Sequence, residues 1–347
     1  MRKSIEAQRL YDDIFRKVMQ KEWLPGTAIP SENDLAGLYG ISRPTVRKML
    51  GALCDNGLLE KRIGRGTFVC FPGEEVSDVP DRAFAVGIDI CNASCFYISD
   101  IMQCLSTLPY REHVYLNFYN QESAGRGEIP AQLEGMLVIH DRMSDKAYQS
   151  FASANIPVVH FNHAYDIPGT GYVTVDHTVE AERAVSNMLR AGLKRVALIG
   201  QGDSFGSFSI YRRSLGWENA CRKFLGEVPE DLIISFKRNH QGGYMAELLK
   251  AEPDSFFFVN MAQYSRFLWE YRNFTGNSGD DLTVLVFDDV DKDVSGIRHN
   301  VNFVRMPLMS MLKKGIEYLW QKKMKPGTPD LQEMFPCDLI IRRDWQQ

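Results

Sequence analysis

The segment SRPTVRKML, residues Ser42–Leu50, places three basic side chains in a short stretch of a 347-residue chain whose formal net charge is −4. Apolar residues recur there at the spacing i, i+3, i+4, i+7, which predicts a helix with one buried face. They are Val46, Met49, Leu50 and Leu53. A lone helix of this kind is often only a charged, solvated surface, so its meaning depends on the segments around it.

The start of this helix is marked by its capping residues. Ser42 is a favourable N-cap whose hydroxyl can accept from the backbone N–H of Thr45. Pro44 falls in the first turn, where a missing N–H costs little. Arg43 and Arg47 are one turn apart, so both can project from the amino-terminal half of the helix.

Three further elements are predicted around it. An amphipathic helix covers about residues 5–21, and a second short helix starts at Ser31 and ends at Gly40. Residues 57–69 contain two strand-like runs around a basic, glycine-rich tip, which predicts a β-hairpin. Three helices followed by a hairpin form a winged helix, a fold that presents its third helix to the DNA major groove.

This region resembles the GntR-type winged-helix signature over about residues 5–71. The matching motifs are Pro30–Ser31–Glu32, Gly40–Ile41–Ser42–Arg43, Thr45–Val46–Arg47, Asn56–Gly57–Leu58–Leu59 and Gly64–Arg65–Gly66–Thr67–Phe68–Val69. The resemblance implies a set of DNA-binding residues in the second helix, the third helix and the wing tip. They are Glu32, Ser42, Arg43, Thr45, Arg47, Gly64 and Arg65. Asn33 departs from the signature, because many relatives carry Arg there.

The charge distribution agrees with this interpretation. Residues 1–71 contain 12 Lys and Arg against 8 Asp and Glu, a net charge of +4. The remaining residues contain 28 against 36, a net charge of −8. A positive first domain on a negative body favours phosphate contact at one end of the chain.

Composition excludes other classes of protein. A hydrophobic content of 44% is that of a globular chain, and no run of 18 apolar residues predicts a membrane span. The amino-terminal stretch lacks the apolar core of a signal peptide, and seven scattered cysteines suggest reduced thiols. A cytoplasmic protein without cofactor or metal is therefore predicted.

A second domain is predicted after a linker rich in Pro and acidic residues. The boundaries are 1–71 for the winged helix, 72–82 for the linker and 83–347 for the second domain. Apolar runs are predicted as strands at residues 84–90, 113–119, 135–140, 157–162, 195–200, 232–236, 255–260 and 283–289. Helices are predicted between many of them, for example at residues 178–191, 211–225 and 308–322. Such alternation predicts an α/β fold with parallel sheets, and its length favours two lobes.

This second domain resembles the sensor domains of LacI/GalR-type regulators over about residues 84–345. The resemblance is carried by residues 173–200, by the Arg–x–x–Gly spacing from Arg213 to Gly216, and by strands ending in Asn260 and Asp288. His177 and Met261 depart from the pattern, because Asn and Asp are usual there. The LacI hinge helix is absent. A GntR-type first domain on such a sensor is similar to the arabinose-repressor-type regulators.

Candidate ligand-binding residues are polar side chains at strand ends and on one helix. Asn162, Asn260 and Asp288 each end an apolar strand, and Arg213 lies early in a helix. Strand ends of a parallel sheet converge on one cleft. Ser209 and Cys91 complete the set. These donors and acceptors suit sugar hydroxyls, although each residue alone could be a cap or a loop residue.

These observations predict a ligand-responsive repressor of carbohydrate-utilisation genes, not an enzyme, which binds operator DNA as a homodimer and is released by a small sugar. A sugar- or nucleoside-binding activator and a GntR-headed enzyme stay as alternatives. A nucleotide-binding loop at Gly200–Gly206 and a metal site at His160–His163 are weaker hypotheses, because the loop spacing carries one extra residue and no third metal ligand is near.

Overall fold

The computed structural model describes residues 2–19, 22–23, 26–55, 58–62, 66–69, 84–89, 95–108, 114–119, 128–139, 143–200, 208–234, 244–288, 301–342 and 345. Within these ranges, no helix is both long enough and apolar enough to cross a membrane. The predicted linker, residues 72–82, lies outside the described residues.

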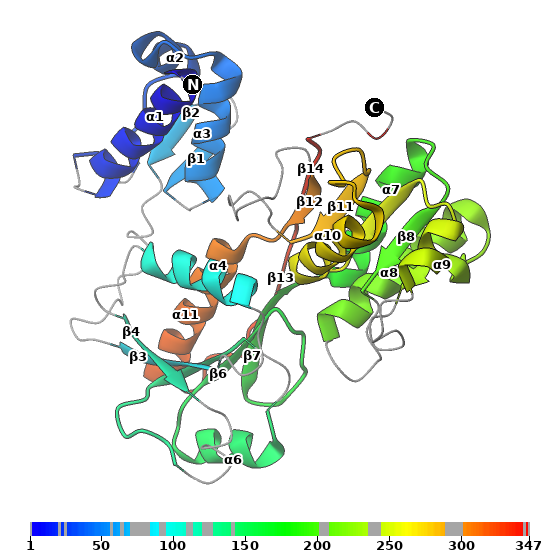
Figure 1. Cartoon of the computed structure of the whole chain (residues 1–347). Coiled ribbons are helices and arrows are strands. Elements are labelled where there is room, and N and C mark those ends of the chain that lie inside the picture. Colours follow the sequence, from blue (N-terminus) through cyan, green and yellow to red (C-terminus); the bar gives the residue numbers. More distant parts are fainter. Residues whose placement is uncertain are drawn as a thin grey trace.

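The amino-terminal domain is a winged helix, as predicted (Figure 1). Its three helices are α1 (Arg2–Met19), α2 (Glu32–Tyr39) and α3 (Arg43–Asp55). Strands β1 (Leu59–Arg62) and β2 (Gly66–Val69) pair antiparallel and form the wing.

Local capping fixes the helix–turn–helix. The Ser31 side chain accepts from the backbone N–H of Asp34, and the Asp34 side chain accepts from the backbone N–H of Ser31. Gly40 ends α2 with a φ of 63°, a conformation that glycine adopts without steric cost. The Ser42 hydroxyl accepts from the backbone N–H of Thr45 at 3.4 Å, which confirms the predicted cap of α3.

The buried face of α3 forms the core of this domain. Val46, Leu50 and Leu53 are buried against Leu10 and Ile14 of α1. Three of the four apolar residues predicted from the sequence are therefore core residues, the fourth, Met49, is partly buried beside them, and the opposite, basic face of α3 stays accessible.

The rest of the chain forms two α/β lobes (Figure 1). The strands of lobe 1 are β3 (Phe84–Asp89), β4 (Val114–Tyr119), β5 (Gly135–Val138), β6 (Val158–Phe161), β7 (Thr170–Val175) and β13 (Gln332–Phe335). They form a parallel sheet in the order β13-β7-β6-β5-β3-β4. The strands of lobe 2 are β8 (Val196–Ile199), β9 (Ile233–Ile234), β10 (Ser255–Phe258), β11 (Val284–Phe287), β12 (Asn302–Arg305) and β14 (Asp338–Ile340). Their order is β14-β12-β11-β10-β8-β9, and only the described pairing of β14 with β12 is antiparallel.

Helices cover both faces of each sheet. Lobe 1 carries α4 (Cys95–Ser106), α6 (Asp145–Ser153) and α11 (Leu308–Met324). Lobe 2 carries α7 (His177–Arg190), α8 (Phe208–Leu225), α9 (Tyr244–Lys250), α10 (Met261–Thr275) and a 3-10 turn at Glu230–Leu232. Phe151 of α6 packs with Met136 and Val158, whereas Leu319 of α11 packs with the alternate residues of the same strands. The strands are therefore buried on both sides, as continuous apolar runs predict.

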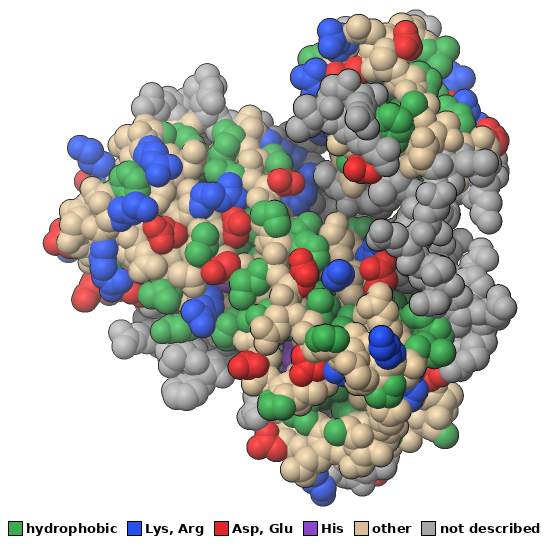
Figure 2. Space-filling view, turned by 180° about the vertical axis from the view of Figure 1, so that it is seen from behind, with side chains coloured by type: hydrophobic (Ala, Val, Ile, Leu, Met, Phe, Trp, Pro, Cys, Tyr) green, Lys and Arg blue, Asp and Glu red, His purple; other side chains and the backbone are tan. Residues whose placement is uncertain are grey.

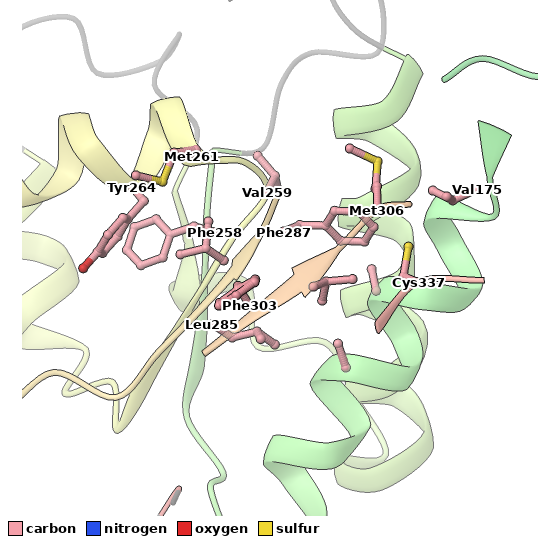
Figure 3. Close-up of a cluster of buried hydrophobic side chains, with 14 of the residues drawn as sticks. Val175, Phe258, Val259, Met261, Tyr264, Leu285, Phe287, Phe303, Met306 and Cys337 are labelled. Atoms are coloured by element: carbon pink, nitrogen blue, oxygen red, sulfur yellow. The ribbon is translucent and has the colours of Figure 1, made fainter. Parts of the chain in front are cut away.

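Among the described elements, the chain passes between the lobes from β7 to α7, from β12 to α11 and from β13 to β14. Figure 3 shows residues of these crossovers, Val175, Met306 and Cys337, in one apolar region with Phe287 at the end of β11. The lobes are therefore joined through one buried region.

On the outside of the molecule, acidic and basic side chains are interspersed over the face shown in Figure 2.

Candidate functional sites

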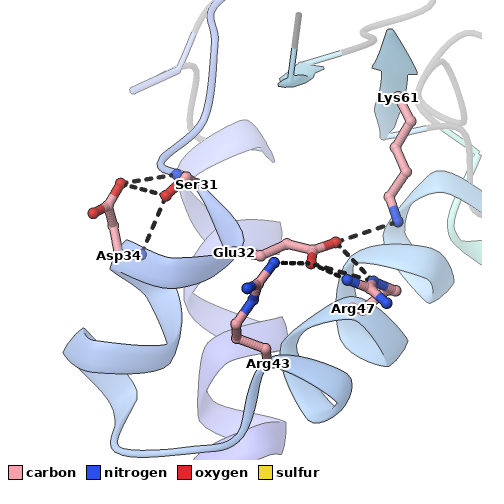
Figure 4. Close-up of polar contacts among 6 residues, drawn as sticks. All are labelled: Ser31, Glu32, Asp34, Arg43, Arg47 and Lys61. Atoms are coloured by element: carbon pink, nitrogen blue, oxygen red, sulfur yellow. Dashed lines mark hydrogen bonds and ion pairs between the residues drawn. The ribbon is translucent and has the colours of Figure 1, made fainter. Parts of the chain in front are cut away.

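Charged side chains from three elements gather at the exposed face of α3, and we call them the α3 charge cluster: Arg43 and Arg47 of α3, Glu32 of α2 and Lys61 of β1. Arg47 donates to the Glu32 carboxylate from Nε at 3.1 Å and from Nη2 at 2.8 Å. Arg43 and Lys61 approach the same carboxylate at 3.9 and 3.8 Å (Figure 4). Three cations therefore surround one anion, and the cluster is net positive.

In the α3 charge cluster, Arg47 is held in place by hydrogen bonds and is still exposed to solvent. The side chain of Arg47 is 59% exposed. The hydrogen bond from Arg47 lowers the pKa of the Glu32 carboxyl, so Glu32 stays ionised and holds the guanidinium edge-on. A guanidinium presented in this way suits the acceptor edge of guanine or a phosphate oxygen.

The other predicted DNA-binding residues divide into two groups. The hydroxyls of Ser42 and Thr45 lie 2.8 Å apart at the start of α3, on the same exposed end as Arg43. Gly64 and Arg65 lie outside the described residues. The structure thus brings the helical members of the set together.

In the sensor, Arg213 of α8 is the centre of a buried polar site. Its side chain is only 3% exposed. Nη1 donates to the Val259 carbonyl at 2.6 Å and to Asp288 Oδ1 at 3.4 Å. The guanidinium lies 3.9 Å from the ring centroid of Phe287, which is a cation–π contact. Arg213 and Asp288, predicted from separate motifs, therefore meet.

Asp288 receives support from two directions. Met261 donates its backbone N–H to Asp288 Oδ2 at 3.1 Å, while Arg213 contacts the other oxygen. Burial raises the pKa of the Asp288 carboxyl, Arg213 opposes that rise, and the charge of Asp100 on α4 adds to it. Asp100 belongs to lobe 1, so the electrostatic environment of Asp288 is shared by both lobes.

The Arg–x–x–Gly spacing has a packing reason. A Cβ atom on Gly216 would lie 2.4 Å from the carbonyl oxygen of Thr178 and 2.7 Å from the Cβ atom of Ala181. Glycine therefore allows α8 to approach α7 closely. Because Arg213 lies on the same helix, this approach places its guanidinium beside the first residue of α7.

The predicted asparagines have different surroundings. Asn260 caps α10, since its side chain accepts from the backbone N–H of Gln263 at 2.9 Å. Asn162 is buried with a φ of 70°, and its Oδ1 has no hydrogen-bond partner among the described residues. Ser209 is buried one turn before Arg213, and Cys91 lies outside the described residues.

His177 belongs to this site, although the sequence identified it only as a departure from the usual residue. It is 2% exposed and is the first residue of α7. Arg213 Nε lies 3.2 Å from His177 Nδ1, and His177 Nε2 lies 3.2 Å from the carbonyl oxygen of Asn162. The sequence feature that could have identified His177 is its position directly after the helix cap Asp176, because an imidazole there has two nitrogens that can form hydrogen bonds.

The two histidines of the His160–His163 segment have protein partners. His160 Nε2 lies 3.1 Å from the Tyr148 hydroxyl, and His163 Nδ1 lies 3.1 Å from the Phe161 carbonyl. Within the described part of the chain, no group of three or more His, Cys, Asp or Glu could hold a metal ion. His163 also forms a ring cluster with Tyr165 and Phe208.

Comparison with known proteins separates the two parts of the chain. Residues 6–69 match the family of bacterial regulatory proteins called gntR. The regulator TreR of Bacillus subtilis is 40% identical over 60 residues, which are 17% of this chain and 25% of that protein. A probable fructoselysine utilization operon repressor of Escherichia coli is 45% identical over 62 residues, 18% of this chain and 24% of that protein. The chain thus spans about a quarter of the length of these curated relatives.

Solved structures match the larger part of the chain. A LacI family transcriptional regulator from Enterococcus faecium with bound ribose covers 75% of this chain and 98% of its own, with a TM-score of 0.62 and 15% identity. A complex of the transcriptional regulator CelR with cellobiose covers 91% of this chain and 100% of its own, with a TM-score of 0.61 and 17% identity. At these identities the likeness concerns the fold. The chain therefore joins a GntR-family winged helix to a two-lobed domain with the fold of the LacI-family regulators.

Proposed function

We propose that this protein is a transcriptional repressor that binds operator DNA through its winged helix and releases it when a small sugar occupies the sensor. The observation that carries the proposal is the presence, in one chain, of the accessible α3 charge cluster and of buried Arg213 paired with partly buried Asp288. The first suits a nucleic acid and the second suits a small polar ligand.

The DNA-binding part rests on the geometry of α3. The apolar face of α3 is buried in the core of the domain, so its basic face points to solvent. Arg43 and Arg47 lie one turn apart, within reach of neighbouring bases or phosphates of a major groove. Relatives that match only this region are regulators and repressors, which supports the assignment of the region to DNA.

The effector part rests on the chemistry of the buried site. Arg213 offers only donors, Asp288 offers acceptors while it is ionised, and Asn162 has a buried acceptor without a partner among the described residues. A neutral sugar carries adjacent hydroxyls that both donate and accept. Structures of the same fold were solved with ribose and with cellobiose, which makes a sugar the first class to test.

The proposal includes a cytoplasmic homodimer. A two-fold dimer would match an operator with two related half-sites, because protein symmetry is mirrored in the DNA that it reads. We place the domain boundaries at residues 71 and 83, on either side of the linker, and place the dimer contacts mainly in the sensor.

The test begins with in vitro selection of duplexes bound by the full-length chain, followed by a thermal-shift screen with D-ribose, L-arabinose, D-glucose and cellobiose. We expect a selected sequence with two half-sites and at least one sugar that raises the melting temperature and weakens DNA binding. Selection of no common sequence would contradict the operator assignment. Binding of a sugar that strengthens DNA binding would instead make the protein a co-repressed regulator or an activator.

A further inference from the structure

His177 connects the candidate effector site to the junction between the lobes. The residue begins α7, the helix that carries the chain from lobe 1 into lobe 2. One ring nitrogen contacts Arg213 in lobe 2, and the other contacts the Asn162 carbonyl at the end of β6 in lobe 1. The imidazole is therefore a bridge between an effector-site side chain and the backbone of the opposite lobe.

The chemistry of the partners determines which nitrogen carries the proton. A guanidinium can only donate, so His177 Nδ1 must accept from Arg213 Nε. The proton then lies on Nε2, which donates to the Asn162 carbonyl. Burial, followed by the nearby Arg213 charge, lowers the pKa of His177 well below its ordinary value, so the ring stays neutral.

Arg213 also touches a second crossover. Its Nη2 lies 3.7 Å from Met306 Sδ, between β12 and the start of α11. Phe287 packs against both the Arg213 guanidinium and the His177 ring. A movement of Arg213 on binding a ligand would therefore displace residues of both crossover segments.

We propose that His177 is a positioning residue that fixes Arg213 for effector binding through Nδ1 and transmits its position to lobe 1 through Nε2. The inference rests on the proposed function and adds the route by which occupancy of the site reaches the inter-lobe angle. Because allostery is a reciprocal coupling free energy, loss of this route would reduce the effect of DNA on sugar affinity.

Two substitutions separate the two halves of the bridge. His177→Asn keeps an acceptor close to the position of Nδ1 but is too short to reach the Asn162 carbonyl. His177→Gln keeps a donor that can reach this carbonyl but lacks the acceptor at the position of Nδ1. Thr178→Val is the matched control, because it alters the next residue of the same helix and keeps its size.

The first measurement needs neither sugar nor operator. In the full-length protein labelled with 15N-histidine, the His177 signals are assigned by their absence from the His177→Asn spectrum. We expect an unprotonated Nδ1, a protonated Nε2 and no titration in the pH range around the ordinary pKa of histidine. A protonated Nδ1, or a ring that titrates in this range, would overturn the bridge.

The second measurement is calorimetry with D-ribose, L-arabinose, D-glucose and cellobiose, with and without the selected DNA duplex. His177→Asn should keep the sugar affinity within about threefold and lose most of its dependence on DNA, whereas His177→Gln should lose about tenfold or more in sugar affinity. Thr178→Val should match the wild type in both. Circular dichroism and thermal unfolding check that each variant is folded.

The outcomes distinguish the two proposals. Full DNA dependence in His177→Asn, or wild-type sugar affinity in His177→Gln, would overturn the role of His177 while leaving the proposed function intact. If no sugar binds the wild type, the sugar assignment fails, and the imidazole spectrum alone decides whether the bridge exists.

Discussion

In the winged helix the side chain of Arg47 is 59% exposed where it pairs with Glu32, whereas in the sensor that of Arg213 is 3% exposed where it pairs with Asp288. Water screens the first pair, so the ion pair itself contributes little free energy and leaves Arg47 accessible to a further partner. In the second pair Arg213 is buried and Asp288 is partly buried, so either partner left alone would be a poorly solvated charge. The same two functional groups thus serve as an accessible contact in one domain and as a fixed centre in the other.

This difference assigns different roles to the neighbouring residues. Around Glu32, the cations approach from α3 and β1 without burying one another. The Arg213 guanidinium instead donates hydrogen bonds to its neighbours: Nη1 donates to the Val259 carbonyl and to Asp288, and Nε donates to His177. Substitutions of Arg213 or Asp288 should therefore alter stability and ligand binding together, while those in the α3 charge cluster should alter binding alone.

The largest effect is expected from Gly216→Leu. The new side chain would collide with the backbone of α7, which cannot move aside as a flexible side chain can. We expect a loss of more than about 3 kcal/mol in the free energy of unfolding of the sensor. Calorimetric unfolding measures it. Gly37→Ala in α2, where nothing lies within 4 Å of the added Cβ, is the control. An unchanged sensor transition in Gly216→Leu would contradict the close packing of α7 and α8.

Arg213→Met should lower the free energy of unfolding by about 2–3 kcal/mol at neutral pH, because it leaves Asp288 without its cation. The loss of Arg213 also raises the pKa of Asp288 further above its unfolded value of 3.8. The folded state then binds more protons than the unfolded state, so the deficit should shrink as pH falls through the folded pKa towards 3.8.

Urea unfolding of wild type and Arg213→Met at several pH values measures this deficit. The double variant Arg213→Met, Asp288→Asn should lose the recovery at low pH, because no carboxyl is left to take up the proton. A deficit that stays constant with pH would show that Asp288 is not the group left unpaired.

Arg47→Ala should weaken binding to the selected operator by about tenfold to a hundredfold, if its guanidinium reads a guanine. The melting temperature should hardly change, since the side chain is exposed and screened. Fluorescence anisotropy at fixed salt measures the affinity. Arg47→Lys keeps the positive charge but removes the planar guanidinium, so it tests which of the two the DNA contact requires. Equal affinity of Arg47→Ala and wild type would remove α3 from the DNA interface.

The smallest effect is expected from Ser31→Ala, which removes the N-cap of α2. The backbone N–H of Asp34 loses its acceptor, and the winged helix should lose about 1 kcal/mol of stability. Calorimetry should show a lower unfolding temperature for the winged helix and an unchanged unfolding temperature for the sensor. A shift of both transitions would show that the two domains unfold as one unit.

The winged helix was predictable because its signals are local. Ser31, Gly40 and Ser42 mark helix ends that the structure contains, and the apolar period in α3 identifies its buried face. Leu38 shows that an apolar residue in a predicted helix need not be buried: it lies in α2, but it is 74% exposed. A helix as short as α2 buries a narrow stripe, so an apolar residue outside the stripe stays in solvent.

In the sensor, strand ends were predictable but contacts between them were not. The runs before Asn260 and Asp288 are buried strands, whereas β7, β12, β13 and β14 were not among the predicted strands. The alternating burial of β13 and the three residues of β14 give weak signals. His177 was missed because its partners lie 15 residues before it and 36 residues after it, a distance that no local pattern reports.

The position of β13 and β14 late in the sequence has a consequence for synthesis. β13 pairs with β7 in one lobe and β14 pairs with β12 in the other, so both sheets gain their last strand from residues 332–340. A ribosome delivers the chain from its amino terminus, and domains fold as they emerge. The winged helix can therefore complete its core, Ala7 to Val69, long before either sheet of the sensor is whole. A nascent chain would hold a finished winged helix ahead of an unfinished sensor.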